Sequence, residues 1–143
     1  MDKISVLRRS ANMRAIRSKD TKPEMAVRRL AHRMGYRFRI HRKDLPGKPD
    51  MVFPGRRAVI FIHGCFWHQH PDPACKDTLP PKSNADYWQP KLLRNQTRDS
   101  EHEAALQAQG WRVLVIWECQ TKDEAALKNL LKSFLESPPV ISN

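Results

Sequence analysis

The apolar positions of the chain fall into runs that predict strands. Residues 36–40 (YRFRI) alternate apolar and basic side chains, which is the period expected of a half-buried strand. Two short apolar runs, 51–53 and 58–62, flank a Pro-Gly turn and predict a β-hairpin. The nearly unbroken run 111–117 (WRVLVIW) is typical of a strand that is buried on both faces of a sheet. Together these runs predict a β-sheet built around a hairpin.

Three segments have the apolar spacing of amphipathic helices. The first, 21–35, opens on the capping-box sequence TKPE and stops at a glycine. The second, 85–109, tolerates a proline in its first turns and is also followed by a glycine, and the third covers 123–135. Because the second helix connects the runs 58–62 and 111–117, it predicts a crossover between two strands. The fold class is therefore α/β, a mixed β-sheet flanked by helices.

One acid interrupts the apolar face of the long helix. Leu92, Asp99 and Leu106 are seven residues apart and share a face, together with Asn95. A carboxylate in such a seam needs a partner, which favours a functional role for Asp99. An aspartate in contact with water on the helix surface is the ordinary alternative.

The length of 143 residues suits one domain with a substantial core. We divide the chain into a basic arm or short helix over 1–20, a single domain over 21–136 and a flexible tail over 137–143. No segment repeats, and none has low complexity.

The chain is strongly basic. Lys and Arg number 26 and Asp and Glu 15, for a net charge of +11, and 14 of the basic residues but only 4 acidic ones fall within 1–45. Such a domain attracts polyanions, of which nucleic acid is the first expectation. A basic protein without such a partner is the alternative, and the arginines of 21–35 fit either a solvated face or phosphate contacts.

Compartment and redox chemistry follow from what the sequence lacks. No run approaches the about 20 apolar residues of a membrane span, and the start MDKISVLRRS has no apolar centre like that of a signal peptide. We therefore expect a cytoplasmic protein. Three cysteines in a reducing compartment do not indicate a disulfide framework, which leaves metal binding or buried thiols.

The stretch 48–75 concentrates the side chains that are capable of chemistry. Asp50 precedes the first strand of the predicted hairpin, whose register places it across from residues 59–61, with His63 just beyond. An acid, a row of backbone carbonyls and a histidine are therefore expected to converge at the end of the hairpin.

A metal site is indicated by the cysteines and their spacing. Cys65, His70 and Cys75 form a C-x4-H-x4-C pattern, and Cys119 follows the run 111–117, which the crossover brings back near the loop. Four such ligands would make a closed structural zinc site. Two alternatives stay open: His68 could replace His70, or the cysteines could be buried reduced thiols.

Four segments of the sequence resemble one family. NMRAIRSKDTKPE at 12–24, LPGKPDMVF at 45–53, VIFIHGCFWHQH at 59–70 and GWRVLVIWEC at 110–119 are similar to the very short patch repair (Vsr) DNA mismatch endonucleases. The resemblance implies a restriction-endonuclease-like fold with a structural zinc ion and a magnesium-dependent active site. The implied reaction is the nicking of one DNA strand 5′ to the thymine of a T:G mismatch that arises from deamination of 5-methylcytosine.

The resemblance also implies roles for individual residues. Two departures are visible: Ile62 stands where the family often has threonine, and the loop 65–75 has a different length. The implied roles are metal binding for Asp50, catalysis for His63, His68 and Asp99, zinc binding for Cys65, His70, Cys75 and Cys119, and insertion into DNA for Phe66, Trp67 and Trp88.

General chemistry agrees with these roles. Magnesium held by Asp50 and the backbone carbonyl of Ile62 would neutralise phosphate charge. His68 can take a proton from water, since imidazole titrates near neutral pH, with Asp99 orienting it and His63 assisting at the phosphate or leaving group. A loop position without a catalytic role is the alternative for either histidine. Glu24 and Asn95 are accessory candidates, although helix capping would explain Glu24 fully.

Phe66 and Trp67 would form a costly exposed apolar patch in a polar loop without a partner. Insertion of the rings between base steps beside a weakened mismatch gives the patch a use. Core packing is the alternative, above all for Trp88.

The expected partner is duplex DNA with a T:G mismatch, bound by a monomer that associates with the bacterial nucleoid. A functional link to a DNA cytosine methyltransferase and a repair polymerase is expected as well. Two other functions stay open: a nuclease of the same fold for another DNA structure or sequence, and a non-catalytic DNA-binding module supported by zinc.

Overall fold

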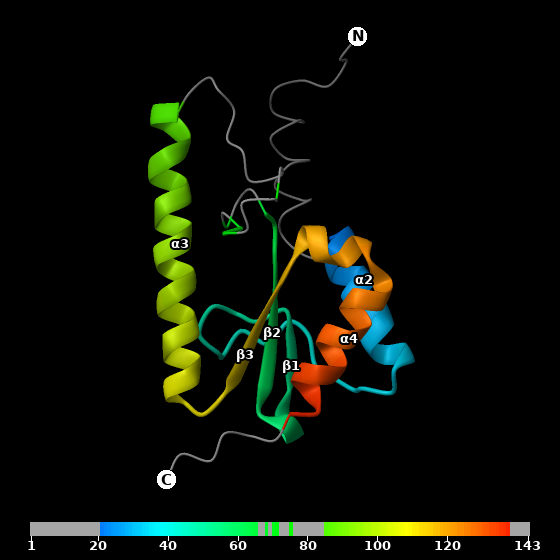
Figure 1. Ribbon diagram of the computed structural model, residues 1–143. Helices are drawn as coiled ribbons and strands as arrows, with labels where there is room; N and C mark the ends of the chain where they lie inside the picture. The colour runs from blue at the N-terminus through cyan, green and yellow to red at the C-terminus, as the bar shows by residue number, and fades with distance from the viewer. Residues whose placement is uncertain (1–20, 66–67, 69, 72–74, 76–84, 138–143) are drawn as a thin grey trace.

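A three-stranded mixed sheet forms the centre of the computed structural model, which describes residues 21–65, 68, 70–71, 75 and 85–137 (Figure 1). In the order β1-β2-β3, β1 pairs with β2 antiparallel and β2 with β3 parallel. The elements are α2 (Lys22–Arg33), β1 (Met51–Phe53), β2 (Ala58–His63), α3 (Ala85–Ala108), β3 (Arg112–Trp117) and α4 (Glu124–Leu135), with short 3-10 turns η1 (Pro54–Arg56) and η3 (Glu118–Lys122).

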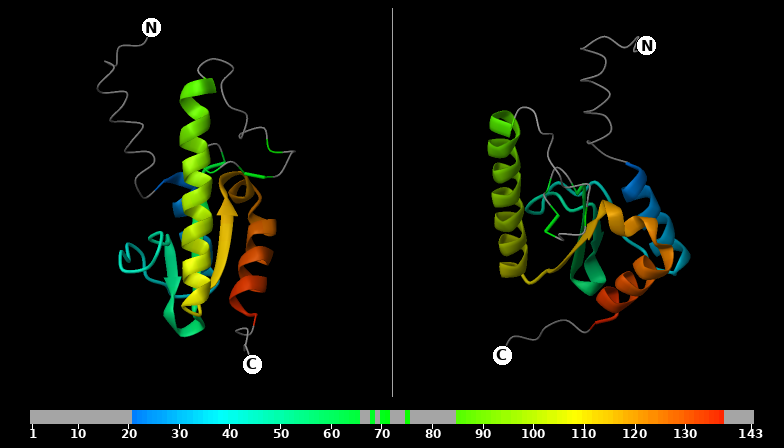
Figure 2. Two further views of the ribbon diagram at one scale, coloured as in Figure 1. Left: turned by 90° about the vertical axis from the view of Figure 1, so that its left-hand side faces the viewer. Right: turned by 45° about the horizontal axis from the view of Figure 1, so that its top comes forward.

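Helices cover the sheet from both sides, as the views in Figures 1 and 2 agree, with α3 on one side and α2 with α4 on the other. The alternation of side chains along the strands creates two cores. Met51 and Ile60 face α2 and α4, whereas Val52 and Val59 pack with Leu106 of α3. The prediction of an α/β fold with a mixed sheet between helices is confirmed.

The boundaries of α2 follow from its capping residues. Thr21 Oγ1 accepts a hydrogen bond from the backbone N–H of Glu24 at 3.4 Å, which satisfies one free donor of the first turn. Gly35 follows the helix with φ +95°, a conformation that glycine adopts without strain. Capping does not explain the Glu24 carboxylate fully, because its Oε2 accepts from Arg28 at 3.0 Å, in a pair that is almost completely buried.

The hairpin agrees with its predicted register. Met51 lies opposite Ile60, and the backbone N–H of Asp50 donates to the Ile60 carbonyl at 3.0 Å. Asp50 therefore lies within the window that the sequence predicted. The crossover from β2 through α3 to the parallel strand β3 is also confirmed.

The strand predicted over 36–40 is wrong. Within this segment only Arg39 is paired, as a single antiparallel bridge to Val52. The alternation of its side chains is real, since Tyr36 is buried and Arg37 exposed. This alternation arises from packing beside β1, whose three residues leave few backbone groups for further strand pairing.

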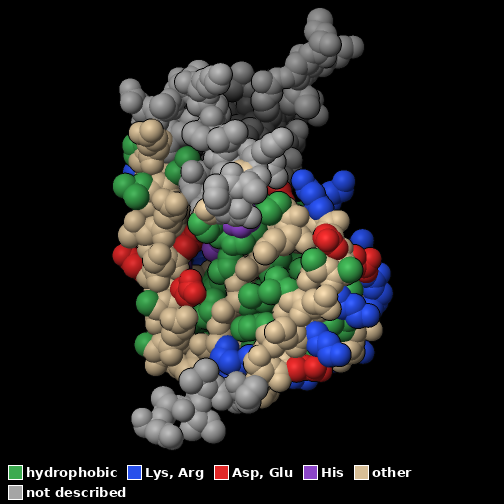
Figure 3. Space-filling model, viewed as in Figure 1, with side chains coloured by type: hydrophobic (Ala, Val, Ile, Leu, Met, Phe, Trp, Pro, Cys, Tyr) green, Lys and Arg blue, Asp and Glu red, His purple; other side chains and the backbone are tan. Residues whose placement is uncertain are grey.

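The prediction that 111–117 is buried on both faces is also wrong. β3 ends the sheet order, so its outer edge has no neighbouring strand among the described residues, and most of its side chains are half-buried. Apolar side chains remain visible between α3 and α4 on the face shown in Figure 3. Only Ile116 of this strand is fully buried.

Some predictions fall outside the described part of the chain. These are the arm or helix over 1–20 and all but the first residue of the tail over 137–143. Among the described residues, no helix combines the length and the apolar character needed to span a membrane.

Candidate active site and metal cluster

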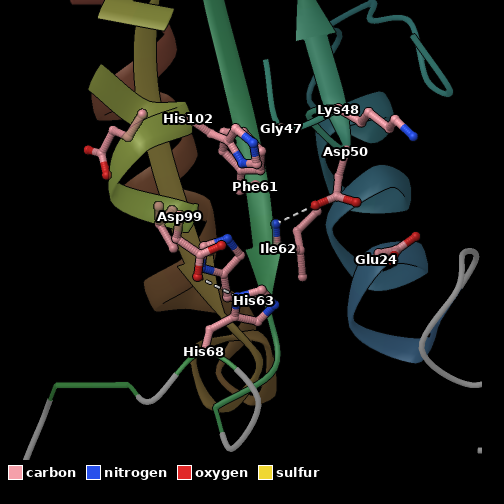
Figure 4. A pocket seen from close by; sticks show the side chains of 12 residues that line it. Glu24, Gly47, Lys48, Asp50, Phe61, Ile62, His63, His68, Asp99 and His102 are labelled. Carbon is pink, nitrogen blue, oxygen red and sulfur yellow. Dashed lines mark hydrogen bonds and ion pairs between the residues drawn. The ribbon is translucent and has the colours of Figure 1, made fainter. Parts of the chain in front are cut away.

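Asp50 lies at the start of the hairpin, where the neighbouring strand fixes its carboxylate. The backbone N–H of Ile62 donates to Asp50 Oδ2 at 2.7 Å (Figure 4). This bond holds one carboxylate oxygen against β2 and leaves the other oxygen available to a ligand. The residue thus has the fixed orientation that a metal ligand needs.

The electrostatic environment of Asp50 fits a cation. Burial above all, with a smaller contribution from the nearby Glu24 carboxylate, raises the pKa of Asp50 to about 7, although the hydrogen bond from Ile62 opposes the shift. Asp50 and Glu24 face the same cavity, and Arg28, which pairs with Glu24, offsets only part of the repulsion between the two carboxylates. The oxygen donors present therefore fit a hard divalent cation such as magnesium.

Asp99 has a hydrogen-bond partner, as its position on the apolar face of the helix predicted. His68 Nδ1 lies 2.6 Å from Asp99 Oδ2, so the imidazole donates its Nδ1 hydrogen to the carboxylate. With that hydrogen engaged, the lone pair of His68 Nε2 is free to accept a proton. The pair brings together residues that are 31 positions apart in the chain.

His63 stacks on His68. The two ring centroids are 3.9 Å apart with an interplanar angle of 10°. His63 Nδ1 is buried, has no hydrogen-bond partner among the described residues and lies 4.0 Å from Asp99 Oδ2. Burial, with a smaller contribution from the neighbouring His68, lowers the pKa of His63 to about 4 against the opposing effect of Asp99. His63 is therefore neutral near pH 7.

These groups face one cavity of about 190 Å³. In Figure 4, His63, His68 and Asp99 lie on one side of it, with Asp50 and Glu24 on the other. The structure thus brings all four predicted catalytic residues to a single cavity, and Ile62 also lines it. Its remaining lining residues are Gly47, Lys48, Phe61, His102, Glu103 and Val115.

Three polar lining residues were missed by sequence reasoning, although the spacing of two of them offered a signal. His102 and Glu103 follow Asp99 by three and four positions, which places them on the same side of α3. Lys48 has no comparable signal beyond its place two residues before Asp50. Its backbone φ of +51° is unusual for a residue with a side chain.

Gly47 permits the close approach of α3 to the turn before Asp50. It has φ +74°, and a Cβ atom at this position would lie 2.8 Å from His102 Cβ. Any larger residue would therefore push the helix away from the turn. The glycine thus contributes to the width of the cavity.

A second cluster consists of three cysteines and one histidine. The ligand atoms of Cys65, His70, Cys75 and Cys119 all lie within 4.8 Å of one another, and the cysteines are free thiols. His70 Nδ1 is 3.8 Å from Cys65 Sγ and 3.4 Å from Cys119 Sγ. Tetrahedral zinc with bonds of about 2.0 to 2.3 Å separates its ligand atoms by about 3.5 to 3.8 Å, so the donor set fits zinc.

The same geometry decides between the two candidate histidines. His70 lies in the cysteine cluster, whereas His68 is engaged with Asp99. Burial, together with the thiols of Cys119 and Cys75, raises the pKa of the Cys65 thiol to about 12, although the backbone N–H of Cys119 opposes the shift. A bound cation would stabilise the thiolates that this environment disfavours.

The aromatic residues predicted to insert into DNA cannot be placed. Phe66, Trp67 and the side chain of Trp88 lie outside the described residues. Of the two accessory candidates, Glu24 lines the cavity. Asn95 is not among the lining residues, and its Oδ1 accepts from Arg98 at 2.8 Å.

Comparison with known proteins points to the same chemistry. The family model described as DNA mismatch endonuclease Vsr matches residues 1–74. The type II nicking enzyme V.XorIIP of Xanthomonas oryzae pv. oryzae is 54% identical over 94% of this chain and 97% of its own. The type II nicking enzyme V.NmeAIP of Neisseria meningitidis is 41% identical over 91% of both chains. DNA mismatch endonuclease Vsr of Escherichia coli is 41% identical over 83% of this chain and 74% of its own.

Proposed function

The chain belongs to the family of Vsr DNA mismatch endonucleases, and we propose that it nicks one DNA strand 5′ to the thymine of a T:G mismatch left by deamination of 5-methylcytosine. That it is an endonuclease acting on DNA follows from the family. That the substrate is a T:G mismatch, and that the strand with the thymine is cut, is our proposal. The supporting observation is the single cavity that holds Asp50 opposite the His68–Asp99 pair.

We further propose that the fold is restriction-endonuclease-like, within a single domain over 21–136 that follows a DNA-binding arm over 1–20. The support is a mixed sheet between helices, with an acid at the mouth of its hairpin and a parallel third strand. The basic residues of the first third of the chain favour a DNA contact on that side.

Magnesium is the cation that we assign to Asp50 and to the backbone carbonyl of Ile62, with Glu24 as an accessory group. When bound, it would neutralise the charge of the scissile phosphate and make water more acidic. Asp50 contributes a carboxylate that is oriented by the Ile62 N–H, at a place where burial disfavours the negative charge without a cation. The oxygen donors of this group suit magnesium better than a soft metal.

His68 is the group to which we assign the proton transfer from water. Its Nδ1–H donates to Asp99 Oδ2, with 2.6 Å between nitrogen and oxygen. Nε2 can therefore accept the proton while the carboxylate stabilises the imidazolium that forms. His63, neutral and stacked on His68, would help to orient that ring and would assist at the phosphate or the leaving group.

We assign zinc to Cys65, His70, Cys75 and Cys119, in a structural role. The four donors leave no open position in a tetrahedral site, which distinguishes structural from catalytic zinc. Such an ion would tie the proline-rich loop after β2 to the residues that follow β3.

Recognition of the mismatch is assigned to aromatic residues that insert between base steps. We propose Phe66 and Trp67 for this role, with Trp88 from the start of α3, and Asn95 as an accessory contact. A mismatch lowers the cost of unstacking at that step. We also infer a cytoplasmic, nucleoid-associated monomer that acts with a DNA cytosine methyltransferase and a repair polymerase.

The test is a nicking assay on labelled duplexes that carry T:G, another mismatch or no mismatch, each with and without magnesium. We expect one product, cut 5′ to the mismatched thymine, only with T:G and magnesium. Metal analysis of the purified protein should show about one zinc per chain. Equal cutting of all duplexes would exclude the mismatch specificity, and undiminished cutting without magnesium would exclude the cation.

Two relatives described as type II nicking enzymes favour a second candidate, a nicking enzyme for another DNA structure or sequence. The same assay separates the two functions. A nick at one sequence in fully matched duplexes would favour this second candidate. Binding without any cut would instead favour a non-catalytic DNA-binding module.

A further inference from the structure

Trp117, at the end of β3, touches both clusters. Its ring stacks on His70 of the cysteine cluster, with centroids 4.5 Å apart and an interplanar angle of 16°. It also meets His63 of the cavity edge to face, at 5.2 Å and 76°. Because His63 in turn stacks on His68, a continuous series of ring contacts runs from the cysteine cluster to the candidate general base.

The backbone holds Trp117 in this place. The parallel register pairs Trp117 with His63, so the two residues face each other across β2 and β3. The backbone N–H of Trp117 donates to Gln120 Oε1 at 2.8 Å, at the start of the turn that carries Cys119. A displacement of Cys119 is therefore expected to move Trp117 through this hydrogen bond.

Ordinary core packing does not account for this tryptophan. Neither of the two hydrophobic cores among the described residues includes it, and its side chain is only half-buried. Its described aromatic partners are the two histidines, one from each cluster. A large ring at the end of an edge strand thus connects the two clusters rather than filling the interior.

We propose that Trp117 is a positioning residue that sets the ring of His63, and through it His68, according to the state of the cysteine cluster. This inference rests on the proposed function, since it takes the cluster as a metal site and His68 as the base. Aromatic rings transmit position well because they are rigid and prefer defined stacked or edge-to-face geometries. A displacement of about 1 Å in a catalytic group can reduce the rate about 100-fold.

The first test compares Trp117→Leu with the conservative Trp117→Phe, in zinc-loaded protein with T:G duplex and magnesium. We expect Trp117→Leu to keep about one zinc per chain and a KM within about threefold, while kcat falls about 10- to 100-fold. Trp117→Phe retains a ring and should recover most of the rate. Phe134→Leu is the matched control, since this half-buried ring on α4 packs against Arg112 and belongs to neither the cavity nor the cysteine cluster.

The second test does not depend on activity. The zinc of the wild-type protein is exchanged for cadmium, a larger ion that displaces its ligands, and the imidazole signals of His63 and His68 are followed by NMR. We expect these signals to shift in the wild type and to stay in place in Trp117→Leu. If the leucine variant does not fold, Trp117→Met, a flexible chain of similar volume, replaces it.

Equal kcat values for wild type and Trp117→Leu, or cadmium shifts that persist in the variant, would overturn the inference. Failure of the proposed function looks different, because wild-type protein would then not nick the T:G duplex or would bind no zinc. If zinc binds but nicking is absent, the NMR comparison still decides the role of Trp117.

Discussion

Two clusters that draw residues from the same loop after β2 differ in the chemistry of their ligands. Cys65, His70, Cys75 and Cys119 bring sulfur and one nitrogen within 4.8 Å of one another. The cavity beside them is lined by carboxylates and imidazoles and leaves about 190 Å³ free. A closed set of soft ligands holds a metal and fixes the chain, whereas an open set leaves room for water and substrate.

The loop after β2 supplies both clusters from alternate histidines. His68 is directed to Asp99 and His70 to the cysteines. The proposed function therefore gives this short segment both a structural and a catalytic role, and damage to either cluster should be distinguishable by its effect. Changes in the cavity should lower the rate and leave stability almost unchanged, whereas changes in the cysteine cluster should first of all lower stability.

The largest effect is expected for Asp50→Asn. Replacing the carboxylate by an amide removes the charge that holds the cation, so nicking should fall by at least about 10⁴-fold. DNA binding, measured by fluorescence anisotropy, should stay within a few-fold, and zinc content should not change. Asp44→Asn is the matched control, because this acid is exposed and paired with Arg42 outside the cavity. Turnover near the wild-type rate would remove Asp50 from the mechanism.

Changes at the His68–Asp99 pair come next. His68→Ala removes the proton acceptor and should lower kcat about 10³-fold, while Asp99→Asn keeps the base but weakens its orientation and should cost about 10- to 100-fold. Both should leave the melting temperature within a few degrees of wild type. His32→Ala, at an exposed position of α2, serves as the control. If the two cavity variants lose stability instead of rate, the pair is structural.

Changes at the cysteine cluster should show the opposite pattern. Cys119→Ser, or removal of zinc by a chelator, should lower the free energy of unfolding by about 3 kcal/mol, since a structural metal contributes directly to folding. Urea denaturation measures the loss, and returning zinc to the chelated wild type should restore it. Activity lost while the protein stays fully stable would place this metal in the reaction.

How much the sequence could reveal differs between the two clusters and the sheet. The position of Asp50 was predictable, because turn residues and apolar alternation fix the register of a hairpin locally. The need of Asp99 for a partner was predictable from helical spacing. The choice of His68 as that partner came from the family resemblance and general chemistry, because helical spacing does not show how a loop 31 residues away folds back.

The errors share one physical cause. A pattern of apolar residues reports that a segment packs against something, but not which strand neighbours it has. Residues 36–40 alternate without forming a ladder, and β3 is apolar although it lies at the edge of the sheet. The spacing of His102 from Asp99 indicated a shared face of α3, but its approach to Gly47 is a tertiary contact that the spacing does not show.

The smallest expected effect concerns how the ionisation of Asp50 changes the stability of the protein with pH. The pKa of Asp50 is raised from 3.8 to about 7, mainly by burial. The folded protein therefore holds this proton more tightly than the unfolded chain. The contribution of this protonated carboxyl to the free energy of unfolding is complete below about pH 4 and is lost as the pH rises through 7. The full shift corresponds to about 4 kcal/mol, and partial contact of the carboxyl with solvent reduces the expected difference to about 2 kcal/mol.

Asp50→Asn should therefore make the magnesium-free protein more stable at pH 8, by about 2 kcal/mol, and leave it unchanged near pH 4. The amide oxygen can still accept from the Ile62 N–H, so the variant loses the charge and keeps the hydrogen bond. Urea denaturation at both pH values measures the difference. Added magnesium should stabilise only the wild type and narrow the gap at pH 8. A gap of the same size at both pH values would mean that folding does not raise the pKa of Asp50, and a gap that magnesium leaves untouched would mean that no cation belongs at this carboxylate.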